Sequence, residues 1–98
     1  METGTVDKIQ LNENGHFFYV VECSDGSYYA GYTVNVHSRI QKHNEGKGAK
    51  YTRGRTPVSL VYVEKLPTKG DALRKEIEFK RFSRAKKEQY IKRGEGMC

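Results

Sequence analysis

Five side chains in this sequence could together cut a phosphodiester bond. They are two phenols, a guanidinium, an imidazole and a carboxylate, at Tyr19, Tyr29, Arg39, His43 and Glu76. Hydrolysis of a phosphodiester needs a base for the attacking water and positive charge around the phosphate, and one carboxylate can help to hold a divalent metal ion. The set predicts metal-assisted cleavage of a polyanion, provided that the fold brings the five side chains together.

The two tyrosines are predicted to lie on a β-hairpin. Residues 16–23 and 27–33 are rich in aromatic and β-branched side chains, and the Ser-Asp-Gly segment at 24–26 is typical of a turn. A two-residue turn would place Tyr19 and Tyr29 on opposite faces of the hairpin. A three-residue turn with a left-handed glycine would place them on the same face. The turn length therefore decides whether the tyrosines can share a site or serve only in packing.

The arginine and the histidine lie four residues apart on a predicted helix. Asn35 is a good N-cap, and the helix is expected to run to about Glu45. Arg39 would otherwise be read as a solvated surface charge, but it lies beside the apolar stripe that should face inward. His43 has the alternative of a helix-end histidine that interacts with the helix dipole.

The carboxylate lies on a second predicted helix, after a third strand at residues 58–64. Thr68 is expected to cap this helix, and Leu73 and Ile77 are expected to mark its inward face. Glu76 is then either a metal ligand or the surface partner of Lys80, four residues later. Glu78 should point to solvent.

These elements predict an α+β fold. It would be a small three-stranded, mainly antiparallel sheet flanked by helices, in the order ββαβα, with a short basic helix at residues 84–93. The length of 98 residues allows one domain, expected at 16–93. A flexible leader is expected at 1–15 and a disordered tail at 94–98.

The charge of the chain favours a polyanionic partner. It carries 18 Lys+Arg against 12 Asp+Glu, a formal net charge of +6. The predicted loop at residues 46–56 has four cations and no acid, so it is expected to bind phosphates, with a flexible solvated loop as the alternative. The four are Lys47, Lys50, Arg53 and Arg55.

The cysteines and the hydropathy of the sequence predict the cellular compartment of the protein. Cys23 and Cys98 fit neither a zinc site nor a disulfide framework, which favours a reducing environment. No apolar run approaches the length of a membrane span, and no signal peptide is apparent. A cytoplasmic protein without membrane association is expected.

With these residues in place, the sequence resembles the GIY-YIG endonuclease superfamily, most closely its small stand-alone bacterial members. The two motifs stand here as Phe17-Phe18-Tyr19 and Tyr29-Ala30-Gly31, followed by the arginine, the histidine and the glutamate at the family's spacing. The likeness runs from about residue 16 to residue 91. It departs from the family pattern where Phe17-Phe18 replaces glycine and isoleucine and where Ala30 replaces the central isoleucine.

The resemblance implies an endonuclease acting on nucleic acid, with DNA as the expected substrate and Mg²⁺ or Mn²⁺ as a single metal cofactor. No small-molecule cofactor is expected. The alternatives are a non-catalytic nucleic-acid-binding module and a protein-interaction module in DNA repair or recombination. The implied roles are general base for Tyr19, positioning of water or phosphate for Tyr29, a grip on the scissile phosphate for Arg39, a hydrogen bond to tyrosine or phosphate for His43, and metal ligation for Glu76.

Overall fold

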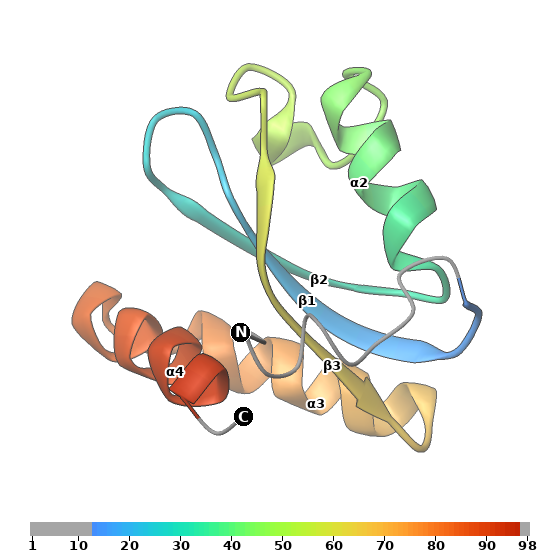
Figure 1. Ribbon diagram of the computed structural model, residues 1–98, viewed down its shortest axis with the longest axis vertical. Coiled ribbons are helices and arrows are strands. Elements are labelled where there is room, and N and C mark those ends of the chain that lie inside the picture. Colours follow the sequence, from blue (N-terminus) through green and yellow to red (C-terminus); the bar gives the residue numbers. More distant parts are fainter. Residues whose placement is uncertain (1–12, 97–98) are drawn as a thin grey trace.

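The computed structural model describes residues 13–96 and folds them around one antiparallel sheet (Figure 1). The strands are β1 (His16–Glu22), β2 (Tyr28–Thr33) and β3 (Ser59–Leu66), in the spatial order β2-β1-β3. The central strand β1 pairs antiparallel with both neighbours. The predicted α+β class and three-stranded antiparallel sheet are confirmed.

Three α-helices and one short 3₁₀ helix complete the domain. The α-helices are α2 (Val36–Asn44), α3 (Lys69–Lys80) and α4 (Arg84–Gly96), and the 3₁₀ helix η1 is Lys50–Thr52. Both predicted caps are present: the Asn35 side chain accepts from the Ser38 amide, and the Thr68 hydroxyl accepts from the Asp71 amide. No described helix is long and apolar enough to cross a membrane.

The helices form a layer on each face of the sheet. α2 covers one face, while α3 and α4 cover the other (Figure 1). Alternate residues of β1 therefore enter two separate cores, which explains why this strand is apolar throughout. The α2-side core contains Phe17, Tyr19, Val21, Cys23, Val36, Val58 and Val63. The α3-side core contains Phe18, Val20, Ala30, Tyr62, Phe79 and Ile91.

The hairpin has the longer turn. Tyr19 pairs with Gly31 and Val21 pairs with Tyr29 across β1 and β2. The Cys23 amide donates to the Ser27 carbonyl at 2.8 Å, and Gly26 between them has φ 85°, a left-handed conformation that glycine adopts without strain. This register places Tyr19 and Tyr29 on one face, and the three-residue alternative is confirmed.

The predicted inward face of α3 was wrong. Leu73 and Ile77 are 37% and 55% exposed, whereas Ala72 and Phe79 are buried. The Phe79 ring packs edge-on against Phe18 with 5.6 Å between centroids. This aromatic contact rotates α3 away from the orientation in which the two aliphatic residues would be buried.

The predicted domain limits also need adjustment. α4 continues to Gly96, so residues 94–96 are helical rather than part of a tail. At the other end, the Gly15 amide donates to the Val34 carbonyl at 2.9 Å, and Glu13 forms an ion pair with Lys65. Residues 13–15 therefore belong to the fold, and the rest of the predicted leader lies outside the described residues.

Candidate active site

A buried chain of hydrogen bonds links Tyr19 to the loop after α2. Tyr19 is 2% exposed and His43 is fully buried. The Tyr19 hydroxyl lies 2.8 Å from His43 Nε2, and His43 Nδ1 lies 2.8 Å from the Thr52 hydroxyl. Thr52 donates its own proton to the Ala49 carbonyl at 2.9 Å.

These partners determine the histidine tautomer. Because the Thr52 proton points to a carbonyl, its oxygen is the acceptor for His43, so Nδ1 carries the hydrogen. Nε2 is then the unprotonated nitrogen, and Tyr19 donates its hydroxyl proton to it. His43 does lie in the last turn of α2, as the helix-end alternative expected, but its ring is buried and bonded on both sides.

Two glycines make room for this chain. A Cβ on Gly31 would lie 2.8 Å from the Tyr19 hydroxyl oxygen, and a Cβ on Gly48 would lie 2.3 Å from His43 Nδ1. Real side chains do not approach so closely. Gly31 therefore allows the Tyr19 ring to lie across β2, and Gly48 allows the loop backbone to pack directly on the imidazole.

Burial sets the protonation of both groups. It raises the pKa of the Tyr19 hydroxyl well above its ordinary value of 10.0; Tyr29 and Glu76 add to the rise, and Arg39 opposes it. Burial also lowers the pKa of His43, and the charge of Arg39 lowers it further. Tyr19 is therefore a phenol and His43 a neutral imidazole at physiological pH.

Lys80 links Tyr29 and Glu76. The Tyr29 ring presents itself edge-on to His43 with 5.5 Å between centroids, and Lys80 lies 5.6 Å from the Tyr29 centroid. Lys80 also holds the Glu76 carboxylate at 2.7 Å, and the Glu76 side chain is 20% exposed. Phe79, the neighbour of Lys80 on α3, packs in the α3-side core.

Arg39, on α2, lies close enough to Tyr19 and His43 to act on both electrostatically. It influences the pKa of both Tyr19 and His43, and it lines a hollow of about 260 Å³ with Lys42 and Lys47. Its lining, as far as the described residues show, has three cations and no acid. Such a surface suits a phosphate group.

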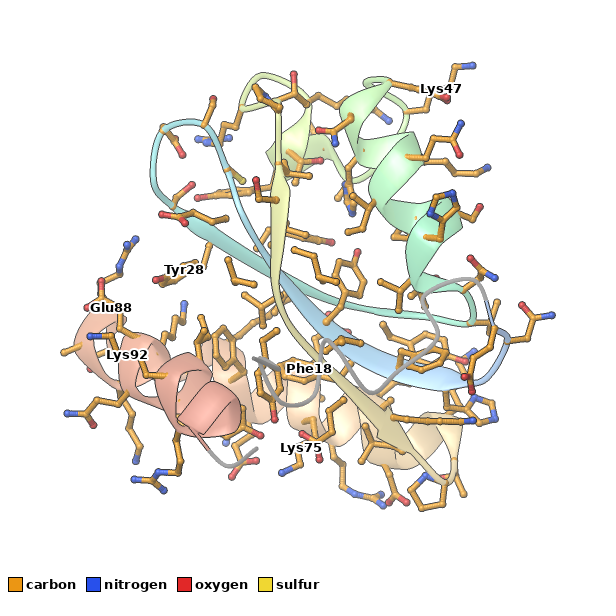
Figure 2. The ribbon with its side chains drawn as sticks, in the orientation of Figure 1. Phe18, Tyr28, Lys47, Lys75, Glu88 and Lys92 are labelled. Atoms are coloured by element: carbon orange, nitrogen blue, oxygen red, sulfur yellow. The ribbon has the colours of Figure 1, made fainter. Side chains whose placement is uncertain are left out.

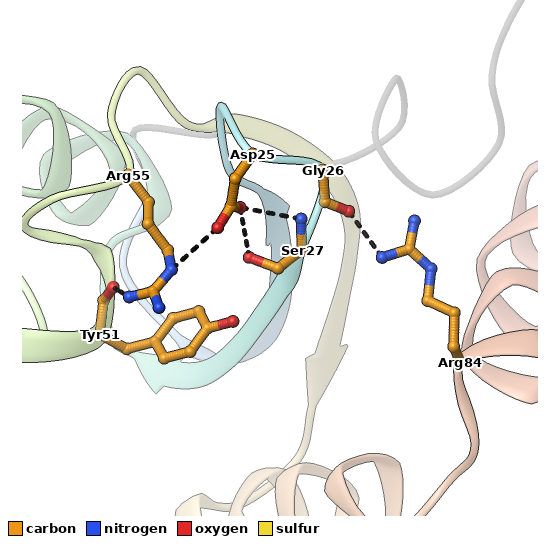
Figure 3. Close-up of polar contacts among 6 residues, drawn as sticks. All are labelled: Asp25, Gly26, Ser27, Tyr51, Arg55 and Arg84. Atoms are coloured by element: carbon orange, nitrogen blue, oxygen red, sulfur yellow. Dashed lines mark hydrogen bonds and ion pairs between the residues drawn. The ribbon is translucent and has the colours of Figure 1, made fainter.

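The structure divides the four predicted phosphate-binding cations into two kinds. Arg55 is tied to the hairpin turn by Asp25, with 3.0 Å between Nε and Oδ2, and it donates to the Tyr51 carbonyl at 2.6 Å (Figure 3). Its guanidinium also covers the Tyr51 ring at 4.1 Å. Arg55 is thus paired with an acid distant in sequence, and its binding of phosphate stays a prediction. Lys47, Lys50 and Arg53 are all exposed.

Three residues near the site were not predicted. Thr52 and Gly48 hold His43, and Lys42 accompanies Arg39. Thr52 and Gly48 were visible only as parts of a basic loop, because nothing in their residue types indicates a histidine partner. Lys42 had a signal, since it lies three residues after Arg39 and so on a neighbouring helix position.

Comparisons with known proteins identify the family of this domain. A family model described as the GIY-YIG catalytic domain matches residues 15–90. The chain belongs to the GIY-YIG family of nuclease catalytic domains. It is 53% identical over 81 residues to the UPF0213 protein YazA of Bacillus subtilis, covering 83% of this chain and 82% of that protein. A UPF0213 protein of Halobacterium salinarum is 56% identical over 73 residues, which are 74% of this chain and 95% of the relative.

Two structural neighbours of this GIY-YIG domain have been solved in solution by NMR. The UPF0213 protein BH0048 from Bacillus halodurans shares 53% identity with a TM-score of 0.56, covering 83% of this chain and 86% of that one. The protein EF2693 from E. faecalis shares 45% identity with a TM-score of 0.60, covering 85% and 88% of the two chains. The names of these relatives state no activity.

Proposed function

We propose that this protein is a metal-dependent endonuclease that hydrolyses phosphodiester bonds in nucleic acid, with DNA as its substrate. The observation that carries the proposal is the 2.8 Å contact between the Tyr19 hydroxyl and His43 Nε2, with a tautomer that leaves Nε2 free to accept a proton. A purely structural tyrosine could bury its hydroxyl against a backbone carbonyl. A neutral imidazole at that place supplies a route for a proton.

Tyr19 would act as the base through His43. As water attacks phosphorus, its proton passes to the Tyr19 oxygen while the Tyr19 proton passes to His43 Nε2. This concerted transfer avoids a free phenolate, which the raised pKa of Tyr19 makes costly. The imidazolium that forms keeps its Nδ1 hydrogen bond to Thr52.

Arg39 and Tyr29 would orient the phosphate. Arg39 belongs to the cationic hollow on one side of Tyr19, and its planar guanidinium suits two phosphate oxygens at once. Charge on those oxygens grows as water attacks, so the grip strengthens toward the transition state. Tyr29, edge-on to His43, is suited to position the attacking water or the phosphate.

Glu76 is the residue proposed to hold the metal ion. The described residues contain no group of three or more His, Cys, Asp or Glu side chains that could form a complete metal site. A single carboxylate still suits Mg²⁺ or Mn²⁺, which take most of their ligands from water and phosphate, and it does not suit structural zinc. When bound, the ion supplies Lewis-acid stabilisation of charge on the phosphate oxygens.

The test compares Glu76→Ala with Glu78→Ala. Both glutamates lie on α3, but Glu78 is exposed and borders a different hollow, beside Arg74 and Ile77, so it is a matched control. We expect Glu76→Ala to abolish Mn²⁺-dependent cleavage of labelled DNA, and Glu78→Ala to retain it. The free energy of unfolding should change by at most about 1 kcal/mol in either, since partly exposed ion pairs contribute little.

The opposite outcome would contradict the proposed role of Glu76. Equal cleavage by the two variants at several Mn²⁺ concentrations would make Glu76 only the partner of Lys80, with which it already pairs. If neither they nor the wild type cleaved DNA but all bound it with a steep salt dependence, the domain would be a non-catalytic nucleic-acid-binding module.

A further inference from the structure

A second hollow, distinct from the Arg39 hollow, follows the free edge of β2. We call it the edge hollow. It has a volume of about 320 Å³ and is lined by Tyr28, Tyr29, Ala30, Tyr51, Phe79, Lys80 and Lys87. Its size falls at the lower end of the range for small-molecule sites.

The walls of the edge hollow are aromatic. Tyr29 and Tyr51 are stacked, with 5.9 Å between centroids and 20° between ring planes. Tyr51 is 40% exposed, whereas Phe79 at 2% lies at the buried end of the hollow. Tyr28 on β2 completes the wall, and Arg84 covers its ring at 4.1 Å. One face of Tyr51 is likewise covered, by Arg55 at 4.1 Å. Aromatic rings stack on nucleobases with little regard to sequence.

Cations border the aromatic walls. Lys80 lies 5.6 Å from the centroid of Tyr29, and Lys87 lies 5.6 Å from the centroid of Phe79. Among the described residues, no acidic side chain lines the edge hollow. Aromatic walls with a cationic border match a nucleotide, whose base is flat and apolar and whose phosphates are anionic.

The edge hollow adjoins the candidate active site through two shared residues. Tyr29 lines the hollow and faces His43, and Lys80 lines the hollow and pairs with Glu76. An occupant of the hollow would therefore be a close neighbour of the phosphate at Tyr19.

We infer that the edge hollow binds an unpaired nucleobase next to the scissile phosphate, so that the substrate is single-stranded or locally unpaired DNA. This inference rests on the proposed nuclease function. A paired base is enclosed by its stacked neighbours and its partner strand, and it cannot enter a hollow unless it leaves the duplex. A single strand offers its bases without that cost.

The first experiment uses the wild-type protein in EDTA, so that metal-dependent cleavage does not occur. A short single-stranded oligodeoxynucleotide is compared with an abasic strand of equal length, which has the same phosphates and no bases. We expect the base-bearing strand to bind roughly tenfold more tightly. In NMR spectra it should shift the amide signals of Tyr28, Ala30 and Lys87, and the abasic strand should leave them unchanged.

The second experiment compares Tyr28→Leu with Tyr32→Leu. Both tyrosines are half-buried on β2, but Tyr32 contacts His16 and Lys69 instead of the edge hollow. Tyr28→Leu should lower the preference for the base-bearing strand at least about threefold, with unchanged affinity for the abasic strand. Tyr32→Leu should keep the wild-type preference.

The outcomes separate the two proposals. Equal affinity of the wild type for the two strands, or base-dependent shifts that avoid the edge hollow, would overturn the base site and leave the nuclease proposal intact. Base preference without any metal-dependent cleavage would overturn the nuclease proposal and support the base site. Failure to bind either strand would overturn the base site, and the nuclease proposal would still be decided by the cleavage assay on Glu76→Ala.

Discussion

His43 is the residue on which the proposed chemistry depends, because it must be neutral when the substrate arrives. Its Nε2 accepts from Tyr19 and its Nδ1 donates to Thr52, so a proton added to Nε2 in the free protein would force the buried Tyr19 hydroxyl to turn its own proton away from His43. Burial and the nearby charge of Arg39 both oppose such protonation and lower the pKa of His43.

This lowered pKa predicts a pH-dependent stability. Between the lowered value and the ordinary value of 6.5, the unfolded chain binds a proton that the folded chain does not. The contribution of His43 is therefore fully present above pH 6.5 and decreases as the pH falls toward the folded-state pKa. We expect the free energy of unfolding to fall more between about pH 7 and pH 5 in the wild type than in His43→Gln, measured by urea denaturation.

The glutamine variant is a suitable reference because its amide can still accept from Tyr19 and donate to Thr52. His16 and His37 are present in both proteins, so their contributions cancel in the comparison. An identical pH dependence in the two proteins would contradict the assignment of His43 as a group that is neutral because of its surroundings.

Among the structural elements, the loop between α2 and β3 is tied to the site most closely. Gly48 packs against the imidazole of His43, so an added methyl group would have to displace the ring or the loop. Gly54 belongs to the same loop, but a Cβ there would meet nothing within 4 Å. The two glycines therefore form a matched pair for substitution.

We expect Gly48→Ala to destabilise the protein by about 1–3 kcal/mol through overpacking and to lower the cleavage rate, because the added methyl group pushes His43 away from Tyr19. Gly54→Ala should change the free energy of unfolding by no more than about 0.5 kcal/mol. Urea denaturation and DNA cleavage measured on both variants check this. A Gly48→Ala protein as stable and active as Gly54→Ala would mean that the loop does not support His43.

The elements differ in how far their sequences predict them. The Ser-Asp-Gly turn and the Asn35 and Thr68 caps are local signals, and all three appear as predicted. The inward face of α3 is not local. Leu73, Ile77 and Phe79 are all apolar, and the packing of Phe79 against the rings of Phe18, Phe82 and Tyr90 decides which of them is buried.

The same distinction applies to the candidate site. The sequence singled out Tyr19, Tyr29 and His43, and the hairpin register and α2 bring them into contact. It did not reveal that Arg55 pairs with Asp25, because the two are far apart along the chain. Contacts across such separations depend on how the elements pack, which residue types alone do not specify.

At the scale of the whole molecule, the cations behind the net charge of +6 differ in position, and only some of them lie near the candidate site. Lys42 and Lys47 border the Arg39 hollow, and Lys50 is exposed on η1. Lys92 is exposed on α4, on the opposite side of the molecule from Lys47 (Figure 2). The position of a cation should matter more than the total charge.

Replacing Lys42, Lys47 and Lys50 by glutamine should therefore weaken DNA binding about equally across sequences. It should also lower the slope of log affinity against log salt by roughly 0.7 to 0.9 for each phosphate that the variant no longer neutralises. The control replaces Lys65 and Lys92 by glutamine. The measurement is binding at several salt concentrations, and equal slopes for the two variants would mean that DNA does not bind the surface beside Arg39.

Hydrogen bonds join the two ends of the loop after α2, and its middle is also held in place. The Asn44 side chain accepts from the Val58 amide at 2.7 Å and donates to the Val58 carbonyl at 3.3 Å, while Arg55 fastens the far side to Asp25. Ordering a free backbone costs about 1–2 kcal/mol per residue. In this protein folding has already met that cost, so under the proposed function a DNA strand would bind a preorganised loop, and its binding energy would remain available for distorting the strand at the phosphate to be cut.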